Sequence, residues 1–126
     1  MKHLPENVVG FGEILWDIFP DGKQLGGAPA NFVWHSHLLK ANAYLVSAVG
    51  SDLLGEEIVQ KAAQLGISQK YLFTVADKPT GTVEVRLDSK GCADYAIRKD
   101  VAWDYIPWIS ELKTLLTQAL TQNPKY

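Results

Sequence analysis

The segment QLGGAPANFVWHSHLL, residues 24–39, places two glycines and a proline directly before a run that is typical of a helix. The pattern predicts that this helix extends from Ala30 to about Lys40. Gly26 and Gly27 carry no side chains, so a ligand can approach the backbone there, and the first N–H groups of a helix are free to donate. The segment is therefore a candidate binding loop. A turn followed by a helix start, with no ligand, is the alternative.

Apolar strands and a second helix surround this segment. Residues 7–12 (NVVGFG), 43–49 (AYLVSAV) and 71–75 are predicted strands. Between the last two, apolar residues recur at helical spacing up to Gly66, a predicted helix C-cap. The order β-α-β-α-β predicts an α/β fold with a parallel sheet and covering helices, that is, part of a doubly wound, Rossmann-like sheet.

A two-residue period appears in two other places. Residues 13–19 put apolar side chains on one face and Glu13 and Asp17 on the other. Residues 82–98 contain two alternating runs around a DSKG turn, which predicts an antiparallel hairpin inserted between the α/β units. The apolar and aromatic face of this hairpin consists of Val83, Val85, Leu87, Tyr95 and Ile97.

A turn and a final helix complete the expected organisation. Residues 20–23 (PDGK) are predicted to form a turn, and Pro107 fits the first turn of a final helix that reaches about Leu120. Three parallel strands make only part of a doubly wound sheet and leave a strand edge unpaired. We therefore expect residues 1–126 to be one fragment of a larger domain.

Composition and charge argue against several classes of protein. The chain has 47% hydrophobic and 21% charged residues and a net charge of −2, without the basic patch that nucleic acid binding requires. Cys92 is the only cysteine, which favours a reducing compartment. The sequence has no apolar run of about 18 residues, as a membrane helix would need, and no signal peptide pattern at its start. We expect a soluble, cytoplasmic protein with no membrane or nucleic acid partner.

Two nucleotide-binding patterns fail and one hydroxyl-binding pattern fits. Leu15 stands where the third glycine of a dinucleotide-binding motif would follow Gly10 and Gly12, and GGAPAN lacks the Gly-Lys-Ser/Thr of a P-loop. The amide of Asn31 both donates and accepts hydrogen bonds, as a hydroxyl does, and the carboxylate of Asp17 can accept from two neighbouring hydroxyls. Together these two residues suit a polyol, whereas either alone is a weak signal.

Five motifs, in this order and spacing, resemble the N-terminal half of ribokinase-like (PfkB) carbohydrate kinases, and their fructokinase-like branch in particular. They are GEILWD (12–17), GGAPAN (26–31), VGSDLLG (49–55), TGTVEV (80–85) and ADYAIRKDVAWD (93–104). As a set they cover nearly the whole chain. The sequence departs from the family at Val33 and Lys40, where small residues are usual. Both departures lie on the predicted helix, away from the expected sugar contacts.

The resemblance implies a substrate site. It implies that Asp17, Gly27 and Asn31 hold the hydroxyls of a monosaccharide, that Gly26 shapes the loop and that Arg98 reaches the substrate, although a solvated arginine at a strand end is the alternative.

The resemblance also implies a lid over the sugar, formed by strands at about 13–19 and 82–98. Such lids often pair between subunits, which implies a homodimer through the apolar hairpin face. Packing of that face on its own domain is equally compatible with the pattern.

The implied reaction is phosphoryl transfer from ATP, with Mg²⁺, to a hydroxyl of a fructose-like sugar. Family members keep the catalytic base and an anion hole in a DTxGAGD-type motif of the C-terminal half, and this sequence has no such motif. We therefore expect an N-terminal fragment without catalytic residues or a bound cofactor of its own, inactive alone. A non-catalytic sugar-binding or dimerisation module is the second hypothesis, and a degenerate product without function is the third.

Overall fold

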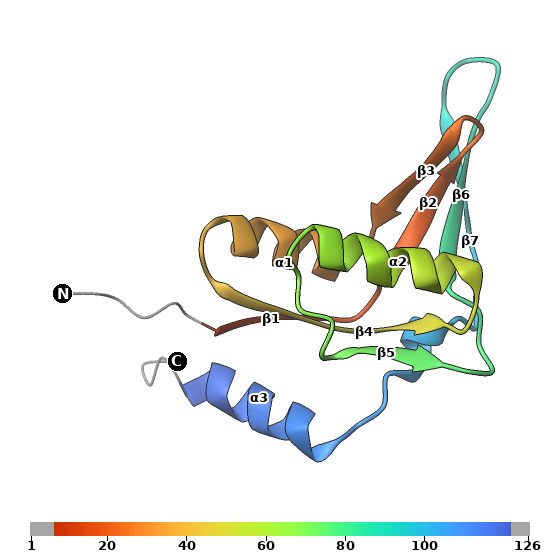
Figure 1. Ribbon diagram of the computed structural model, residues 1–126. Coiled ribbons are helices and arrows are strands. Elements are labelled where there is room, and N and C mark those ends of the chain that lie inside the picture. Colours follow the sequence, from red (N-terminus) through yellow and green to blue (C-terminus); the bar gives the residue numbers. More distant parts are fainter. Residues whose placement is uncertain (1–6, 122–126) are drawn as a thin grey trace.

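A parallel three-stranded sheet, here called the body sheet, crosses the molecule in the order β1-β4-β5 (Figure 1). The computed structural model describes residues 7–121. The strands are β1 (Asn7–Phe11), β4 (Asn42–Gly50) and β5 (Leu72–Val75). β4 is buried from Leu45 to Gly50 because it is the central strand with helices over both faces. The predicted α/β fold with a parallel sheet is confirmed.

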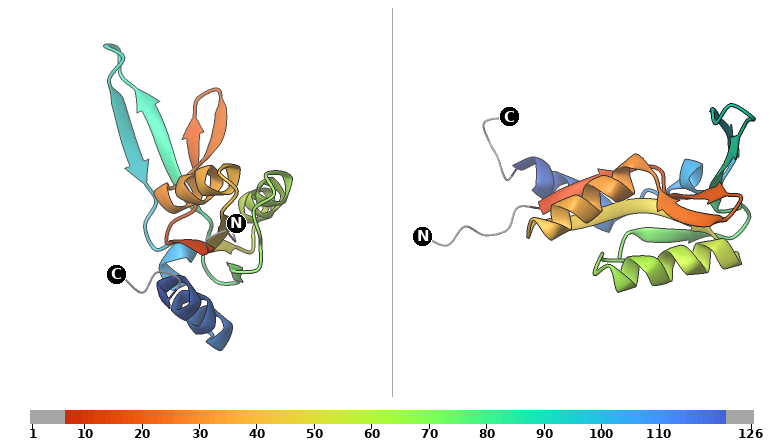
Figure 2. Two further views of the ribbon diagram at one scale, coloured as in Figure 1. Left: turned by 90° about the vertical axis from the view of Figure 1, so that its left-hand side faces the viewer. Right: turned by 90° about the horizontal axis from the view of Figure 1, so that it is seen from above.

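Three helices cover the body sheet, two on one face and one on the other (Figures 1 and 2). Helices α1 (Ala28–Leu38) and α2 (Leu53–Gln64) bury apolar side chains against one face, and α3 (Ser110–Thr121) packs Leu112 and Leu115 under the other. None of these helices, nor any other part of residues 7–121, provides a segment long and apolar enough to span a membrane as a helix.

The start of α3 differs from the prediction. Pro107 lies before the helix, because a short 3₁₀ helix, η1 (Ala102–Tyr105), is followed by extended backbone at Ile106 (φ −63°, ψ 120°). A residue before proline is driven towards extended conformations. Ile106 and Ile109 also pack against the sheet from this connection, so their burial holds the chain out of a helix until Ser110.

A second sheet, here called the lid sheet, stands out from one end of the body sheet (Figure 1). Its order is β3-β2-β6-β7, formed by β3 (Gly22–Gly26), β2 (Leu15–Phe19), β6 (Gly81–Leu87) and β7 (Ala93–Ile97). β2 pairs in parallel with β6 and antiparallel with β3, and β6 and β7 form the predicted antiparallel hairpin. β3 was not predicted. The turn expected over residues 20–23 is shorter, because pairing with β2 already begins at Gly22.

The apolar hairpin face is divided between two environments. Val83 and Val85 are buried against Leu15 of the same sheet, so this half of the face packs on its own domain. Towards the tip and on β7 the side chains face solvent, with exposed fractions of 65%, 62% and 66% for Leu87, Tyr95 and Ile97.

A carboxylate at the start of α2 joins the body sheet to the lid sheet. Asp52 caps the helix by accepting from the backbone N–H of Gly55 at 2.8 Å, and it also accepts from Thr80, from the backbone N–H at 3.0 Å and from the hydroxyl at 2.6 Å. The hydroxyl oxygen of Thr80 in turn accepts from the N–H of Gly50 at 2.8 Å. Thr80 is fully buried and directly precedes β6. The end of β4, the start of α2 and the base of the lid are therefore held by one network.

Two glycines are required where the backbone segments of this network approach one another closely. A Cβ atom on Gly50 would lie 2.5 Å from the carbonyl oxygen of Lys78, and one on Gly55 would overlap the carbonyl oxygen of Gly50. Backbone atoms cannot move away as a flexible side chain can. The motifs VGSDLLG and TGTVEV thus describe one structural contact.

The two departures from the family pattern have structural counterparts. Val33 is fully buried and packs on β1, where a Cβ on Gly10 would lie 2.5 Å from its Cγ2 atom. Gly10 therefore serves helix packing, in agreement with the rejection of a dinucleotide site. Lys40, just past the end of α1, has φ 69°, in the left-handed region where glycine is favoured.

We expect Asp52→Asn to lower the free energy of unfolding by about 2 kcal/mol at pH 7, because a charged acceptor of three hydrogen bonds is replaced. Burial alone would raise the pKa of the Asp52 carboxyl, but hydrogen bonds from Thr80 and Gly55 lower it overall. The stabilisation is therefore complete above the unfolded-state pKa of about 4 and is lost as pH falls through the lower folded-state pKa.

Urea unfolding at pH 7, 5, 4 and 3 measures this effect, with Asp21→Asn, an exposed turn residue, as the control. The gap between wild type and Asp52→Asn should narrow below pH 4. A gap of constant size across this range would contradict the assigned role of the carboxylate.

Candidate functional site

Asp17 is the only charged side chain on one face of the lid strands. Alternation along β2 puts Asp17 on the face of Leu15 and Phe19, and the register pairs it with Val83 of β6 and Gln24 of β3. Within the four strands, the other members of this face are apolar residues, glycines and the Gln24 amide. A half-buried carboxylate in such surroundings is a strong hydrogen-bond acceptor for a bound polar group.

The glycine pair forms the floor beside this carboxylate. A Cβ on Gly26 would overlap the Asp17 carboxylate, which lies over the glycine. Gly27 has φ 103°, and a Cβ there would lie 2.6 Å from the carbonyl oxygen of Glu13. No side chain caps α1, which begins directly after Gly27. Backbone donors of its first turn therefore face the same junction as the carboxylate.

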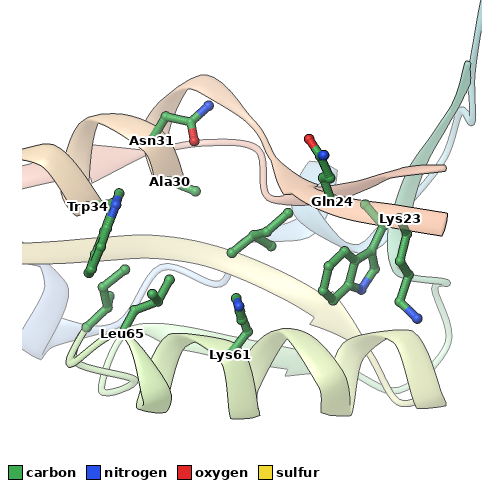
Figure 3. Close-up of a pocket in the computed structure, with 10 residues that line it drawn as sticks. Lys23, Gln24, Ala30, Asn31, Trp34, Lys61 and Leu65 are labelled. Atoms are coloured by element: carbon green, nitrogen blue, oxygen red, sulfur yellow. The ribbon is translucent and has the colours of Figure 1, made fainter. Parts of the chain in front are cut away.

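Asn31 completes the group from the first turn of α1. Its backbone N–H donates to the carbonyl of Gly27 at 3.1 Å, and its exposed side chain points to the same side as that of Gln24 (Figure 3). Gln24 lies opposite Asp17 in the register, so these two side chains face one side of the β2–β3 ribbon, and Asn31 stands beside them at the start of α1. Asp17, Gly26, Gly27 and Asn31 are thus gathered at the junction of β3 and α1.

Arg98 is not brought to this junction. Arg98 directly follows β7, and its side chain lies on the same face as Asp94 and Ala96, opposite to the face of Ile97. Its backbone N–H donates to the carbonyl of Thr82 at 3.0 Å. It borders a shallow depression with Glu84 on that other face. Its charge contributes to the lowered pKa of Asp52, after the hydrogen bonds described above.

Gln24 is a site residue that the sequence analysis missed. The sequence predicts a turn over residues 20–23 (PDGK) and no strand over residues 22–26, where β3 lies. β3 (GKQLG) shows no polar/apolar alternation, because Lys23 and Gln24 are both polar, so the sequence offers no clear strand signal there.

A cavity of about 560 Å³ lies on the other side of the β2–β3 ribbon, between this ribbon, α1 and α2 (Figure 3). Its lining consists of Trp16, Lys23, Gln24, Leu25, Ala30, Asn31, Trp34, Lys61, Leu65 and Ile67. Trp16 and Asp17 are consecutive residues of β2, so the cavity and the Asp17 junction lie on opposite faces of one strand.

The donors at the β3–α1 junction suit hydroxyl groups better than a metal ion or phosphates. Residues 7–121 include no group of three or more His, Cys, Asp or Glu side chains placed to hold a metal ion. One carboxylate, one or two amides and free backbone N–H groups instead provide both acceptors and donors, which is the requirement of a polyol.

Comparison with known proteins identifies the family of the chain. The family model described as pfkB family carbohydrate kinase matches residues 11–120. The chain belongs to this family of carbohydrate kinases. A search of curated proteins gave no significant match.

Solved structures of sugar kinases share the fold. A sugar kinase from Pyrococcus horikoshii is 26% identical with a TM-score of 0.70, over 80% of this chain and 40% of that one. Fructokinase from Vibrio cholerae O395 is 26% identical with a TM-score of 0.71, over 77% and 36% of the two chains. Fructokinase from Xylella fastidiosa with bound ATP is 25% identical with a TM-score of 0.71, over 79% and 33%. The chain thus spans less than half the length of each of these structures.

The two glycines should respond differently to alanine. Gly27→Ala places a Cβ against backbone and keeps a positive φ, so we expect a loss of about 2–4 kcal/mol in the free energy of unfolding. Gly26→Ala meets side-chain atoms of Asp17 and Leu15, which can rotate away, and should cost under about 1 kcal/mol. Urea unfolding of the two variants side by side measures the difference, and equal losses would argue against the loop geometry described.

Proposed function

We propose that this chain is the sugar-binding, N-terminal part of an ATP-dependent sugar kinase that phosphorylates a hydroxyl of a fructose-like monosaccharide. The observation that carries the proposal is the single carboxylate of Asp17 on an otherwise uncharged lid face, beside Gly26, Gly27 and the amide of Asn31. Membership of the pfkB family and likeness to two fructokinases support the substrate class.

In this proposal each group at the junction has a separate task. Asp17 accepts from two neighbouring hydroxyls of the sugar, and Asn31 donates to one oxygen and accepts from another. Gly26 and Gly27 let the sugar approach the backbone, where N–H groups at the start of α1 donate. Leu15 and Val83 offer apolar contact to the C–H face of the ring. The side chain of Arg98 lies on the other face of the lid sheet. Its contact with the sugar therefore stays a prediction.

The lid sheet would exclude water from the sugar, which strengthens hydrogen bonds to its hydroxyls. Activation of the attacking hydroxyl needs a general base, and stabilisation of the transferring group needs positive charge and Mg²⁺. The family's DTxGAGD-type motif, which supplies the base and anion hole, does not occur in this sequence. We therefore propose that residues 1–126 are inactive alone and that ATP and Mg²⁺ are cofactors of the complete enzyme. The cytoplasmic location stays a prediction from the single cysteine.

A non-catalytic sugar-binding or dimerisation module is the second candidate. It is favoured by the exposed apolar side chains of Leu87, Tyr95 and Ile97, which a second copy of the lid could cover. Both candidates share the sugar site and differ in whether catalysis follows.

Calorimetric titration of the 126-residue chain with fructose tests the sugar site. We expect saturable binding that weakens at least tenfold in Asp17→Asn, because one acceptor for two hydroxyls is altered, and in Gly26→Ala, because the carboxylate is displaced. Asp21→Asn, an exposed acid in the adjacent turn, is the matched control and should bind as wild type does. Equal affinity in Asp17→Asn and wild type would overturn the site, and detectable phosphorylation of fructose by the chain with Mg²⁺–ATP would overturn its inactivity.

Sedimentation equilibrium tests the lid dimer. Ile97→Asp places a charge on the apolar lid face. We expect the dissociation constant of the dimer to rise at least tenfold, because an unpaired carboxylate buried in the interface is costly. Ala96→Asp, on the opposite face of the same strand, is the control and should leave the dimer intact. A wild-type chain that stays monomeric at 100-fold different concentrations would reject the dimer.

A further inference from the structure

We propose that the cavity between the β2–β3 ribbon, α1 and α2 is a second ligand site, which binds a small aromatic carboxylate with a single negative charge. Its volume of about 560 Å³ lies within the range of small-molecule pockets, roughly 300–1,000 Å³. The cavity lies on the opposite face of the β2–β3 ribbon from Asp17 and shares Gln24 and Asn31 with the proposed sugar junction, but the proposal does not depend on that function.

The walls of the cavity suit a flat apolar body. Trp16 and Trp34 contribute two indole rings, and Leu25, Leu65 and Ile67 contribute aliphatic surface. The Trp16 ring is fixed in place, because its Nε1–H donates to the carbonyl of Leu54 at 2.9 Å. A pre-positioned ring loses little conformational freedom when a ligand packs on it, which favours binding.

The charges around the cavity leave one cation without a counter-ion. Lys23 forms an ion pair with Glu57 at 2.7 Å and lies 5.2 Å from the centre of the Trp16 ring, so its charge is already balanced. Lys61 lines the same cavity, on the side of α2, and pairs with no acidic group among residues 7–121. The ligand that complements this arrangement carries one negative charge beside an apolar ring.

The polar groups argue against a sugar in this cavity. The Asn31 and Gln24 amides line the rim of the cavity, and Gln24, which lies opposite Asp17 in the register, points away from α2 (Figure 3). Six of the ten lining residues are apolar, and hydroxyls of a polyol packed against them would be left without partners. Apart from Lys23 and Lys61, the polar side chains at the cavity are those of Gln24 and Asn31. Both lie at the rim, where they could also bind a hydroxyl-bearing ligand beside Asp17.

Calorimetric titration with indole-3-acetate and with its neutral analogue indole-3-acetamide tests the proposal on the 126-residue chain. We expect saturable binding of the carboxylate, about fivefold tighter than that of the amide, the effect of one partly exposed ion pair. Lys61→Gln should weaken binding of indole-3-acetate by the same factor and leave binding of indole-3-acetamide unchanged. Lys113→Gln, on α3 across the sheet, is the matched control and should change neither.

Two further measurements separate this site from non-specific binding and from the sugar site. Leu25→Trp should fill the cavity and abolish binding of both probes, while circular dichroism still reports a cooperative melt. Saturating fructose should not displace the probe, whether or not fructose itself binds. Unchanged binding in Leu25→Trp, equal affinity for the two probes, no saturable binding by the folded wild type, or displacement by fructose would each overturn the proposal.

Discussion

The hydrogen bonds between the Asp52 carboxylate and Thr80 hold together the two sheets on which the rest of the structure depends. The carboxylate caps α2 and receives both donors of Thr80, and the Thr80 hydroxyl receives the last N–H of β4. Hydrogen bonds to an ionised acceptor are stronger than neutral ones, and burial of Thr80 shields them from water. The angle at which the lid sheet leaves the body sheet is therefore set largely at its base.

Three other segments join the lid to the rest of the chain, and two of them lead to the candidate site. The segment from Gly12 to Ile14 carries the chain from β1 into β2, and Gly26–Gly27 carries it from β3 into α1. At Gly27 the second attachment passes close to the first, at the carbonyl of Glu13. Asp17, Gly26 and Asn31 meet where these crossings bring β2, β3 and α1 together. The same backbone contacts that fix the lid thus also position the proposed sugar contacts.

The period-based predictions succeeded where a segment has its own strong pattern. The body strands, α1, α2 and the β6–β7 hairpin are predicted by continuous apolar runs, helical spacing or two-residue alternation in the sequence. Burial alternates along β6 from Gly81 to Arg86, whereas β7 is exposed along its whole length. β3 (GKQLG) was missed because it has no alternation of its own and becomes a strand by pairing with the neighbouring β2. The start of α3 was missed because packing of Ile106 and Ile109 against the distant body sheet delays the helix.

The candidate site was only partly accessible from the sequence for the same reason. Asp17 and Asn31 could be selected by their chemistry, whereas the need for glycine at position 26 depends on a carboxylate nine residues earlier in the chain. Alternation along the hairpin already places Arg98 on the face opposite to Ile97, but only the pairing of β2 with β6 shows that Asp17 lies on the Ile97 face.

The position of the junction in the fold gives an argument for ligand binding that does not use the family. In open α/β sheets, ligands bind outside the carboxyl ends of the parallel strands. β1 ends at Phe11 and leads directly into β2, which carries Asp17, while the free backbone donors of α1 begin at the same end of the sheet. Topology, donor placement and the single carboxylate therefore favour the same end of the molecule.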